Sequence, residues 1–510
     1  MDASSEQLNV RFPKPALVPS SIVSTPTIHA GRTPESTQAV LDCLKDNHQR
    51  FHILGFHNHA SHHLLAIYAM GASAEVIRGA YDTHIAYQRP AKDRVCAATV
   101  DEKNWKDHLG DEMYYQAYVS FFSQLLLSQQ TKGLQTILED YVFSTDANLV
   151  AGKNGVKPYM LGRFYSGFFH PLIHIAYGAE FGLPGLAAEG LAQAAVHSLD
   201  TEAIFTPEFF NVDSVDTLAS RLSSLAVSTA GAMGLNTPSA DVHALTILSR
   251  IEKDTDFAPE NLKLPDLRNL GSVYSVVVSQ ADGKLLKYAE EWSKTVIPDR
   301  DVLKRKFEEL VWMNTVIYGV GGWGGRALGG DEKGKFNGDF ILMHGVTSVM
   351  MTASLLNTLS LNSTVLLLRA YFVFSLLAYT VRGRPALPIK DFYANTSLYP
   401  SPPGAQPAAA KDTIEPSTAP NPWLPIVQTT LVHPDEHLCK AQRSLMHFAV
   451  CYGGTELGAF AHSGLQGAEV LDGTLFARVA ALTADRLGWM REGEGKRGWD
   501  FNGFSQVSKI

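Results

Sequence analysis

GFHNHASHHLL, residues 55–65, places four histidines within seven residues and opens an apolar run that Gly71 ends. His59 and His63 are four residues apart, so on a helix they share one face, and His62 lies on nearly the same side. Two neutral imidazoles at this spacing can hold one zinc, iron, copper or nickel ion. The alternative is a helix whose histidines are buried and hydrogen-bonded, and this stretch alone leaves both interpretations open.

The composition is that of a large globular protein. Of its 510 residues 45% are hydrophobic and 18% are charged, with a net charge of −8. Nucleic-acid binding depends on clustered Lys and Arg, so this balance disfavours a nucleic-acid partner. The four cysteines form no Cys-x-x-Cys pair, and residues 1–15 lack the pattern of a secretory signal. We therefore expect a reducing, cytoplasmic location without a disulfide framework.

Apolar residues recur at helical spacing along most of the chain, whereas the alternation typical of strands is nearly absent. We therefore expect an all-α fold with a single large multi-helix domain over residues 33–510, after an irregular arm at 1–32. Thr33, followed by Pro34 and an acidic residue, predicts the start of the first long helix.

Other segments give weaker signals. The helical pattern continues over 212–233, and the Pro/Ala-rich residues 400–422 predict a surface loop. Residues 319–338 are expected to be a glycine-rich loop, and their G-x-G-x-x-G lacks the preceding strand that a dinucleotide site requires. Residues 365–380 are apolar but short for a membrane span and contain Arg369, so they predict a buried core helix and no span.

A second histidine pair lies in a long apolar helix, residues 162–178, that contains Pro171. An internal proline removes one backbone hydrogen bond and presses on the carbonyl four residues back, here Gly167, so the helix should kink. His170 and His174 flank this point four residues apart. Kinks in buried helices often lie at functional sites, although packing alone also produces them.

Two further expected helices carry histidines. One, from Asp339 to about Leu359, contains His344; the other contains His437 and Lys440 on one face. A lysine beside a histidine is usually a solvated charge. In a metal pocket, however, a lysine of lowered pKa can add carbon dioxide as the neutral amine, and the resulting carbamate is a carboxylate ligand.

The start of that last helix allows two interpretations. His433 and Asp435 could belong to a site of two histidines and one carboxylate, but a capping role for Asp435 is preferred. Six aromatic residues lie near the histidine stretches: Tyr114, Tyr118, Phe164, Phe168, Trp312 and Tyr318. Most of them are expected to pack in the core, while a subset could line a pocket for a flat aromatic substrate.

Four stretches together resemble the questin oxidase-like family of fungal polyketide pathways: HNHASHHLLAIYAMGAS, GFFHPLIHIAYGAEFGLPGLAAEGLAQAAVH, DFILMHGVTS and HPDEHLCKAQRSL. They occur in order over roughly residues 35–470. The resemblance implies a flavin-independent Baeyer–Villiger-type monooxygenase or ring-cleaving oxygenase. Its implied substrates are an anthraquinone or related polyketide and dioxygen, with NADPH as co-substrate.

The resemblance also implies a non-haem iron(II) site that is rich in histidine and contains a carboxylated lysine. We hypothesise that this iron(II) activates dioxygen for attack on a carbonyl carbon of the quinone. Carried over residue by residue, it assigns the metal-binding and catalytic residues as His59, His170, His344, His437 and Lys440 (carboxylated), with His63 and His174 as second choices. We expect a buried metal site of four imidazoles and one carbamate.

Two other classes of function stay open. A helical metal-dependent hydrolase would use zinc or manganese to activate water, although such sites normally contain several carboxylate ligands. A non-catalytic helical scaffold would bind no stoichiometric metal and consume no oxygen. Metal content together with oxygen consumption separates the three.

Overall fold

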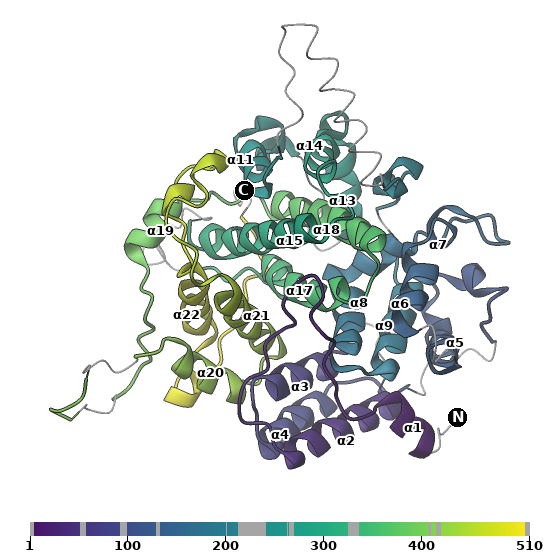
Figure 1. Ribbon diagram of the computed structural model, residues 1–510, viewed down its shortest axis with the longest axis horizontal. Helices are drawn as coiled ribbons and strands as arrows, with labels where there is room; N and C mark the ends of the chain where they lie inside the picture. Colours follow the sequence, from purple (N-terminus) through teal and green to yellow (C-terminus); the bar gives the residue numbers. More distant parts are fainter. Residues whose placement is uncertain are drawn as a thin grey trace, which may run out of the picture.

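The computed structural model describes residues 5–51, 58–91, 99–128, 133–199, 201–212, 241–262, 264, 270–324, 336–405, 410–414 and 420–504. These residues form helices, short helical turns and two isolated β-bridges, and no strand occurs among them (Figure 1). The all-α prediction is confirmed. His57 and nearly all of the expected helical segment 212–233 lie outside the described residues.

The α-helices are α1 (Ser5–Arg11), α2 (Pro34–Arg50), α3 (Ala60–Ala69), α4 (Ala74–Ile85), α5 (Tyr115–Ser128), α6 (Gly133–Leu138), α7 (Asp146–Leu149), α8 (Met160–Phe181), α9 (Pro184–Val196), α11 (Ala244–Lys253), α12 (Pro259–Leu262), α13 (Leu270–Ser279), α14 (Lys284–Ser293), α15 (Arg300–Thr315), α16 (Gly321–Gly324), α17 (Phe340–Leu356), α18 (Leu361–Val381), α19 (Ile389–Asn395), α20 (Trp423–Val432), α21 (Glu436–Tyr452) and α22 (Leu475–Leu487).

Short-range signals set several helix starts. At α2, the Thr33 side chain accepts the Ser36 amide at 3.1 Å and the Ser36 hydroxyl accepts the Thr33 amide at 2.9 Å, which forms a capping box. Asp339 caps α17 and Asp435 caps α21, each by accepting two amides of the first turn at 3.0 Å. The capping role expected for Asp435 is confirmed.

Four helices that are far apart in the chain meet near the centre of the molecule. Helix α3 contacts α8, α8 contacts α17, α17 contacts α21, and α21 contacts α3, so the contacts close into a cycle. In Figure 1, α17 lies between α8 and α21, with the purple helix α3 next to them. This cycle determines where the histidine side chains can converge.

The N-terminal arm is more ordered than the sequence predicts, because α1 forms within it. Leu8 and Phe12 are buried, and the Phe12 ring packs edge-on against His48 with a centroid distance of 5.1 Å. A helix of this length is unstable alone, so its contacts with α9 and α5 and the burial of its apolar side chain Leu8 explain why it forms. Sequence periodicity over so few residues gives no clear signal.

The glycine-rich segment 319–338 also differs from the prediction, since it begins in helical conformation. The chain continues from α15 through a π-helical turn, η9 (Val316–Val320), into α16. A Cβ on Gly319 would lie 2.2 Å from Val479, and one on Gly322 would lie 2.6 Å from Phe336. These glycines allow close packing and do not form a turn between a strand and a helix. Residues 325–335 lie outside the described part.

Helix α18 is longer than the expected apolar core segment. Its 21 residues would suffice for a membrane span by length and composition, but 94% of its most apolar window is buried inside the protein. Arg369 donates to three backbone carbonyls, those of Ser293, Asn211 and Val296. The helix therefore packs as a core helix, as the sequence predicts.

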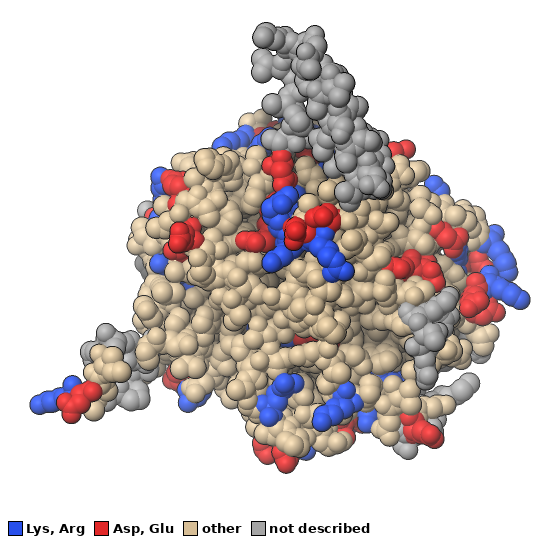
Figure 2. Space-filling view, in the orientation of Figure 1, with Lys and Arg blue, Asp and Glu red and all other residues tan. Residues whose placement is uncertain are grey.

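The described surface is electrostatically mixed. In the face shown in Figure 2, positive and negative side chains are interspersed and broad areas carry neither. The described residues of the Pro/Ala-rich segment 400–422 form no helix and extend away from the body at the lower left of Figure 1.

Candidate metal centre

Four histidine side chains form a closed ring where α3, α8, α17 and α21 meet. Successive ring centroids lie 4.8 Å (His59–His170), 5.0 Å (His170–His344), 5.1 Å (His344–His437) and 4.7 Å (His437–His59) apart. All four side chains are buried. The Nε2 atoms of His59 and His170 are separated by 2.8 Å, and ligand nitrogens of His59, His170 and His437 all lie within 4.8 Å of one another. His344 completes the ring through its contacts with His170 and His437.

Main-chain carbonyls orient two of these rings. His170 donates its Nδ1 proton to the Gly167 carbonyl, and His344 donates its Nδ1 proton to the Phe340 carbonyl at 2.7 Å. A neutral imidazole that donates from Nδ1 has its lone pair on Nε2. Both Nε2 atoms are therefore available as ligand atoms.

The bend in α8 places the carbonyl that holds His170. Gly167, Phe168 and Phe169 all have left-handed backbone angles, with φ of 55°, 56° and 67°. Pro171 cannot donate the backbone hydrogen bond that a straight helix would need there. The kink predicted from Pro171 is confirmed, and it lies directly before His170.

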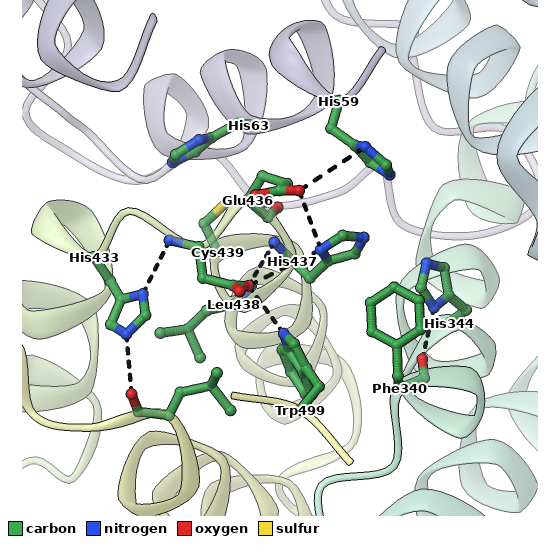
Figure 3. A network of polar contacts seen from close by, with 12 residues as sticks. His59, His63, Phe340, His344, His433, Glu436, His437, Leu438, Cys439 and Trp499 are labelled. Carbon is green, nitrogen blue, oxygen red and sulfur yellow. Dashed lines mark hydrogen bonds and ion pairs between the residues drawn. The ribbon is translucent and has the colours of Figure 1, made fainter. Parts of the chain in front are cut away.

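Glu436 lies beside the other two rings. One of its carboxylate oxygens is 3.9 Å from His59 Nδ1 and 3.7 Å from His437 Nδ1, as Figure 3 shows. These distances are longer than direct hydrogen bonds, but the negative charge favours placing the Nδ1 protons of both rings on its side. The Nε2 atoms of His59 and His437 then remain for the centre. The sequence identified Glu436 only as an acidic residue of a first helical turn.

Lys440 follows His437 by three residues on α21 and is buried. Its amine has no hydrogen-bond partner among the described residues. Burial lowers the pKa of Lys440 to about 8, although nearby acidic groups oppose this shift. Burial and the charge of Lys440 lower the pKa of His344 to about 3 and hold the pKa of His437 well below its ordinary value. The positive charge of a protonated Lys440 therefore disfavours protonation of both imidazoles.

The donor set fits a divalent transition metal. His344 Nε2, His437 Nε2 and Lys440 Nζ are buried atoms without a hydrogen-bond partner in the described structure. Leaving such atoms unsatisfied typically costs about 1–3 kcal/mol each. The lowered pKa values keep the imidazoles of His344 and His437 neutral near pH 7, and neutral imidazole nitrogen is a good ligand for iron, zinc or copper.

His63 lies outside this ring, although helical spacing relates it to His59. Its Nδ1 is 3.0 Å from His84 Nε2, and the other ring nitrogen of His84 is 2.7 Å from the Tyr87 hydroxyl. His59 is the residue before the first turn of α3 and faces His170 of α8, whereas His63 faces α4. The spacing therefore does not bring the two imidazoles to one ion.

His174 belongs to a separate buried network. Its Nδ1 is 2.9 Å from His62 Nε2, and its Nε2 donates to Glu189 at 2.8 Å. His48 donates to the second oxygen of Glu189, and Arg11 contacts the far side of His48 at 3.1 Å. Both second-choice residues are thus hydrogen-bonded close to the ring without being part of it.

One aromatic side chain directly borders the histidine ring on α17. The Phe340 centroid lies 4.7 Å from that of His344 and 4.8 Å from that of His437. Among the aromatic residues that the sequence suggested, Phe168 lies 5.9 Å from His344, whereas Trp312 packs in the core against Phe460. The sequence did not single out Phe340.

Known proteins with similar sequences are named as oxidases or oxidoreductases. A family model described as questin oxidase-like matches residues 56–445. A Baeyer–Villiger oxidase of Pestalotiopsis microspora, GME11358, is 30% identical over 62% of this chain and 63% of its own length. The oxidoreductase AflY of Aspergillus parasiticus is 35% identical over 32% of each chain, and a questin oxidase of Aspergillus terreus is 32% identical over 32% of this chain and 36% of its own. The matches thus span less than two thirds of these relatives.

Proposed function

The chain belongs to the questin oxidase-like family, and we propose that it is an iron-dependent oxygenase that oxidises and opens a planar aromatic polyketide such as an anthraquinone. Relatives named as Baeyer–Villiger oxidases and questin oxidase support an oxidative function on a polyketide. The reaction would insert oxygen next to a ring carbonyl or cleave the adjacent carbon–carbon bond. The first step in testing this proposal is to identify the metal.

The observation that supports the proposal best is the closed ring of four buried imidazoles with an unpartnered lysine amine beside it. His59, His170, His344 and His437 would hold iron(II), with Lys440 as a fifth ligand after carbamate formation. Iron(II), when bound, supplies the ability to activate dioxygen.

The surrounding residues would orient and protect this centre. The carbonyls of Gly167 and Phe340 fix two imidazoles, and Glu436 favours the same tautomer in the other two. Because the ring is buried, bulk water is largely excluded from the reacting carbonyl. Phe340 would contact the flat substrate beside His344 and His437.

NADPH as co-substrate stays part of the proposal. In a Baeyer–Villiger-type monooxygenation, one atom of dioxygen enters the product, and the other leaves as water after uptake of two electrons and two protons. A nicotinamide cofactor is a suitable two-electron donor. No residue is assigned to its binding.

The arrangement of carboxylates supports a metal-dependent hydrolase less well than an oxygenase, because few of the described carboxylates near the histidine ring are free to bind a metal. Asp435 accepts two amides of α21 and the indole N–H of Trp499 through one oxygen, Oδ1, each at 3.0 Å, so this oxygen already serves a structural role. Asp435 and Glu436 both lie near His437, but neither belongs to the group of possible ligands formed by His59, His170 and His437 in the described part of the chain. Histidine-dominated sites suit redox metals at least as well as zinc.

Elemental analysis and oxygen uptake with an emodin-type anthraquinone test the proposal together. We expect about one iron per chain and substrate-dependent oxygen consumption. Stoichiometric zinc or manganese with no oxygen consumption would favour the hydrolase, and absence of both metal and oxygen uptake would favour a non-catalytic scaffold.

A further inference from the structure

We propose that Phe501 is a substrate-stacking residue and, with Phe340, forms the aromatic face against which a planar polycyclic substrate binds. This inference rests on the proposed function, because it assumes that the histidine ring is the reaction centre. It assigns a role in substrate specificity to a residue outside the matched family region, residues 56–445.

Three aromatic layers connect the surface to the histidine ring. Phe501 is 63% exposed, and its ring centroid lies 4.6 Å from that of Phe340 at an interplanar angle of 32°. Phe340 is half-buried and in turn contacts the rings of His344 and His437, which are buried. Exposure therefore falls steadily from Phe501 through Phe340 to the candidate metal centre.

Backbone hydrogen bonds fix the position of Phe501 relative to Phe340. The Phe340 amide donates to the Asp500 carbonyl at 2.9 Å, and the Asp500 amide donates to the Gly338 carbonyl at 2.9 Å. Further along, the Phe504 amide donates to the Arg382 carbonyl at 2.7 Å. Phe501 therefore lies between anchored positions on both sides and is held next to the start of α17.

The C-terminal segment, residues 499–504, is also hydrogen-bonded to α21, the helix that carries two other candidate ligands. The Trp499 indole donates to Asp435, the cap of α21, at 3.0 Å. Helix α21 contributes His437 and Lys440. The segment thus connects α17 and α21 beside the histidine ring and places one aromatic side chain in solvent there.

The exposed side chain of Phe501 contributes little to the stability of the fold, although its backbone position is well anchored. Its apolar surface is mostly left in water, and single exposed apolar residues need no explanation when they stand alone. Phe501, however, continues a series of ring contacts that reaches two candidate metal ligands: its ring is tilted against Phe340, which meets His344 and His437 edge-on. Offset stacking favours flat, electron-poor rings such as those of a quinone, so the chemistry of the face fits fused aromatic ketones better than compact alicyclic ones.

Binding of the soluble planar probe anthraquinone-2-sulfonate to full-length, iron-loaded protein tests this assignment. Calorimetric titration would compare the wild type with Phe501→Ala, Phe501→Leu and Phe501→Trp. Leu457→Ala is a matched control, because Leu457 is 66% exposed and lies in a different segment, between α21 and the helical turn η11 (Ala461–Ser463). Iron content and thermal unfolding would be measured on every variant.

We expect Phe501→Ala and Phe501→Leu to raise the Kd of the probe by about three- to tenfold, which is typical of losing one aromatic stacking partner. Phe501→Trp and Leu457→Ala should stay close to the wild type, and iron content should not change. With a converted substrate, KM should rise more than kcat falls.

Two results would overturn the inference: wild-type affinity in Phe501→Ala, or weaker binding that is accompanied by loss of iron in all three variants, which would indicate a structural role. Failure of the proposed function is a separate observation, because it requires wild-type protein without iron or without oxygen uptake.

Discussion

The Nε2 atoms of His59 and His170 lie 2.8 Å apart, although 111 positions separate the two residues in the chain. Two nitrogen ligands at about 2.1 Å from one ion, seen from it at about a right angle, would be about 3 Å apart. The fold thus holds these two imidazoles at the separation of neighbouring ligands. Forming such an arrangement in advance reduces the ordering that metal binding would otherwise require.

Removing one imidazole from the ring should remove the metal. We expect His344→Ala to reduce bound iron from about one atom per chain to a small fraction, because His344 Nε2 has no other hydrogen-bond partner in the described structure. Oxygen uptake should fall in parallel. The control is His447→Ala, since His447 is also buried but lies on α21 and is not a member of the histidine ring. Elemental analysis of folded protein checks this, and full iron content with full turnover in His344→Ala would contradict the metal mechanism.

Lys440 should react with carbon dioxide. A lowered pKa raises the neutral fraction of an amine at a given pH: with a pKa of about 8, roughly one tenth is neutral at pH 7, far more than for an ordinary lysine. We expect a carbamate signal in carbon-13 NMR with labelled bicarbonate that grows from about pH 6 to about pH 8. Lys440→Met should lack the signal and bind less iron, and short carboxylates should partly restore binding in Lys440→Ala.

An unchanged carbamate signal in Lys440→Met would show that another amine carries it. Iron binding and turnover that are equal in Lys440→Met and the wild type would contradict a role for this lysine as a ligand.

Glu436 should tune iron affinity without being indispensable. We expect Glu436→Gln to weaken iron binding by about 10- to 100-fold, because the charge that favours Nδ1 protonation of His59 and His437 is lost. Folding should change little, since the side chain is only partly buried. Competition with a chelator measures the affinity. Glu290→Gln, an exposed carboxylate paired with Lys294, is the control, and equal affinity in both variants would exclude the orienting role.

The buried network around Glu189 should make the free energy of unfolding depend on pH in the acidic range. Burial alone would raise the pKa of Glu189, but hydrogen bonds from His174 and His48 outweigh it and lower the pKa from 4.5 to about 2. The folded state therefore binds the proton less tightly than the unfolded state. The ionised carboxylate contributes its stabilisation above about pH 4.5, and this contribution is lost as the pH falls toward 2.

A shift of this size corresponds to at most about 3 kcal/mol. Glu189→Gln should be less stable than the wild type at neutral pH and should lose less stability on acidification. Urea unfolding at several pH values between about 6 and 3 measures both, and parallel stability curves for the two proteins would contradict this prediction.

Local features of the sequence predicted the helices well, because caps and apolar spacing act within a few residues. The capping box at Thr33, the cap at Asp435 and the kink before His170 all follow from neighbouring positions. The glycines at 319–324 were interpreted wrongly, since their role is to admit Val479 and Phe336, which no local pattern reveals.

The site itself could be predicted only in part. The resemblance to a family selected the four histidines that the fold brings together, whereas helical spacing alone favoured His63 and His174. Glu436, Phe340 and Phe501 could not be identified beforehand, because their positions near the ring depend on how α17, α21 and the C-terminal segment meet.

Two of the candidate ligands are held by main-chain oxygens, those of Gly167 and Phe340. A carbonyl is present whatever side chain the residue carries, so substitutions around these histidines can accumulate without turning the rings. Such a framework allows the side chains around the candidate centre to change while the orientation of these two imidazoles is kept, so the surroundings of the ligands and the ligands themselves can vary independently.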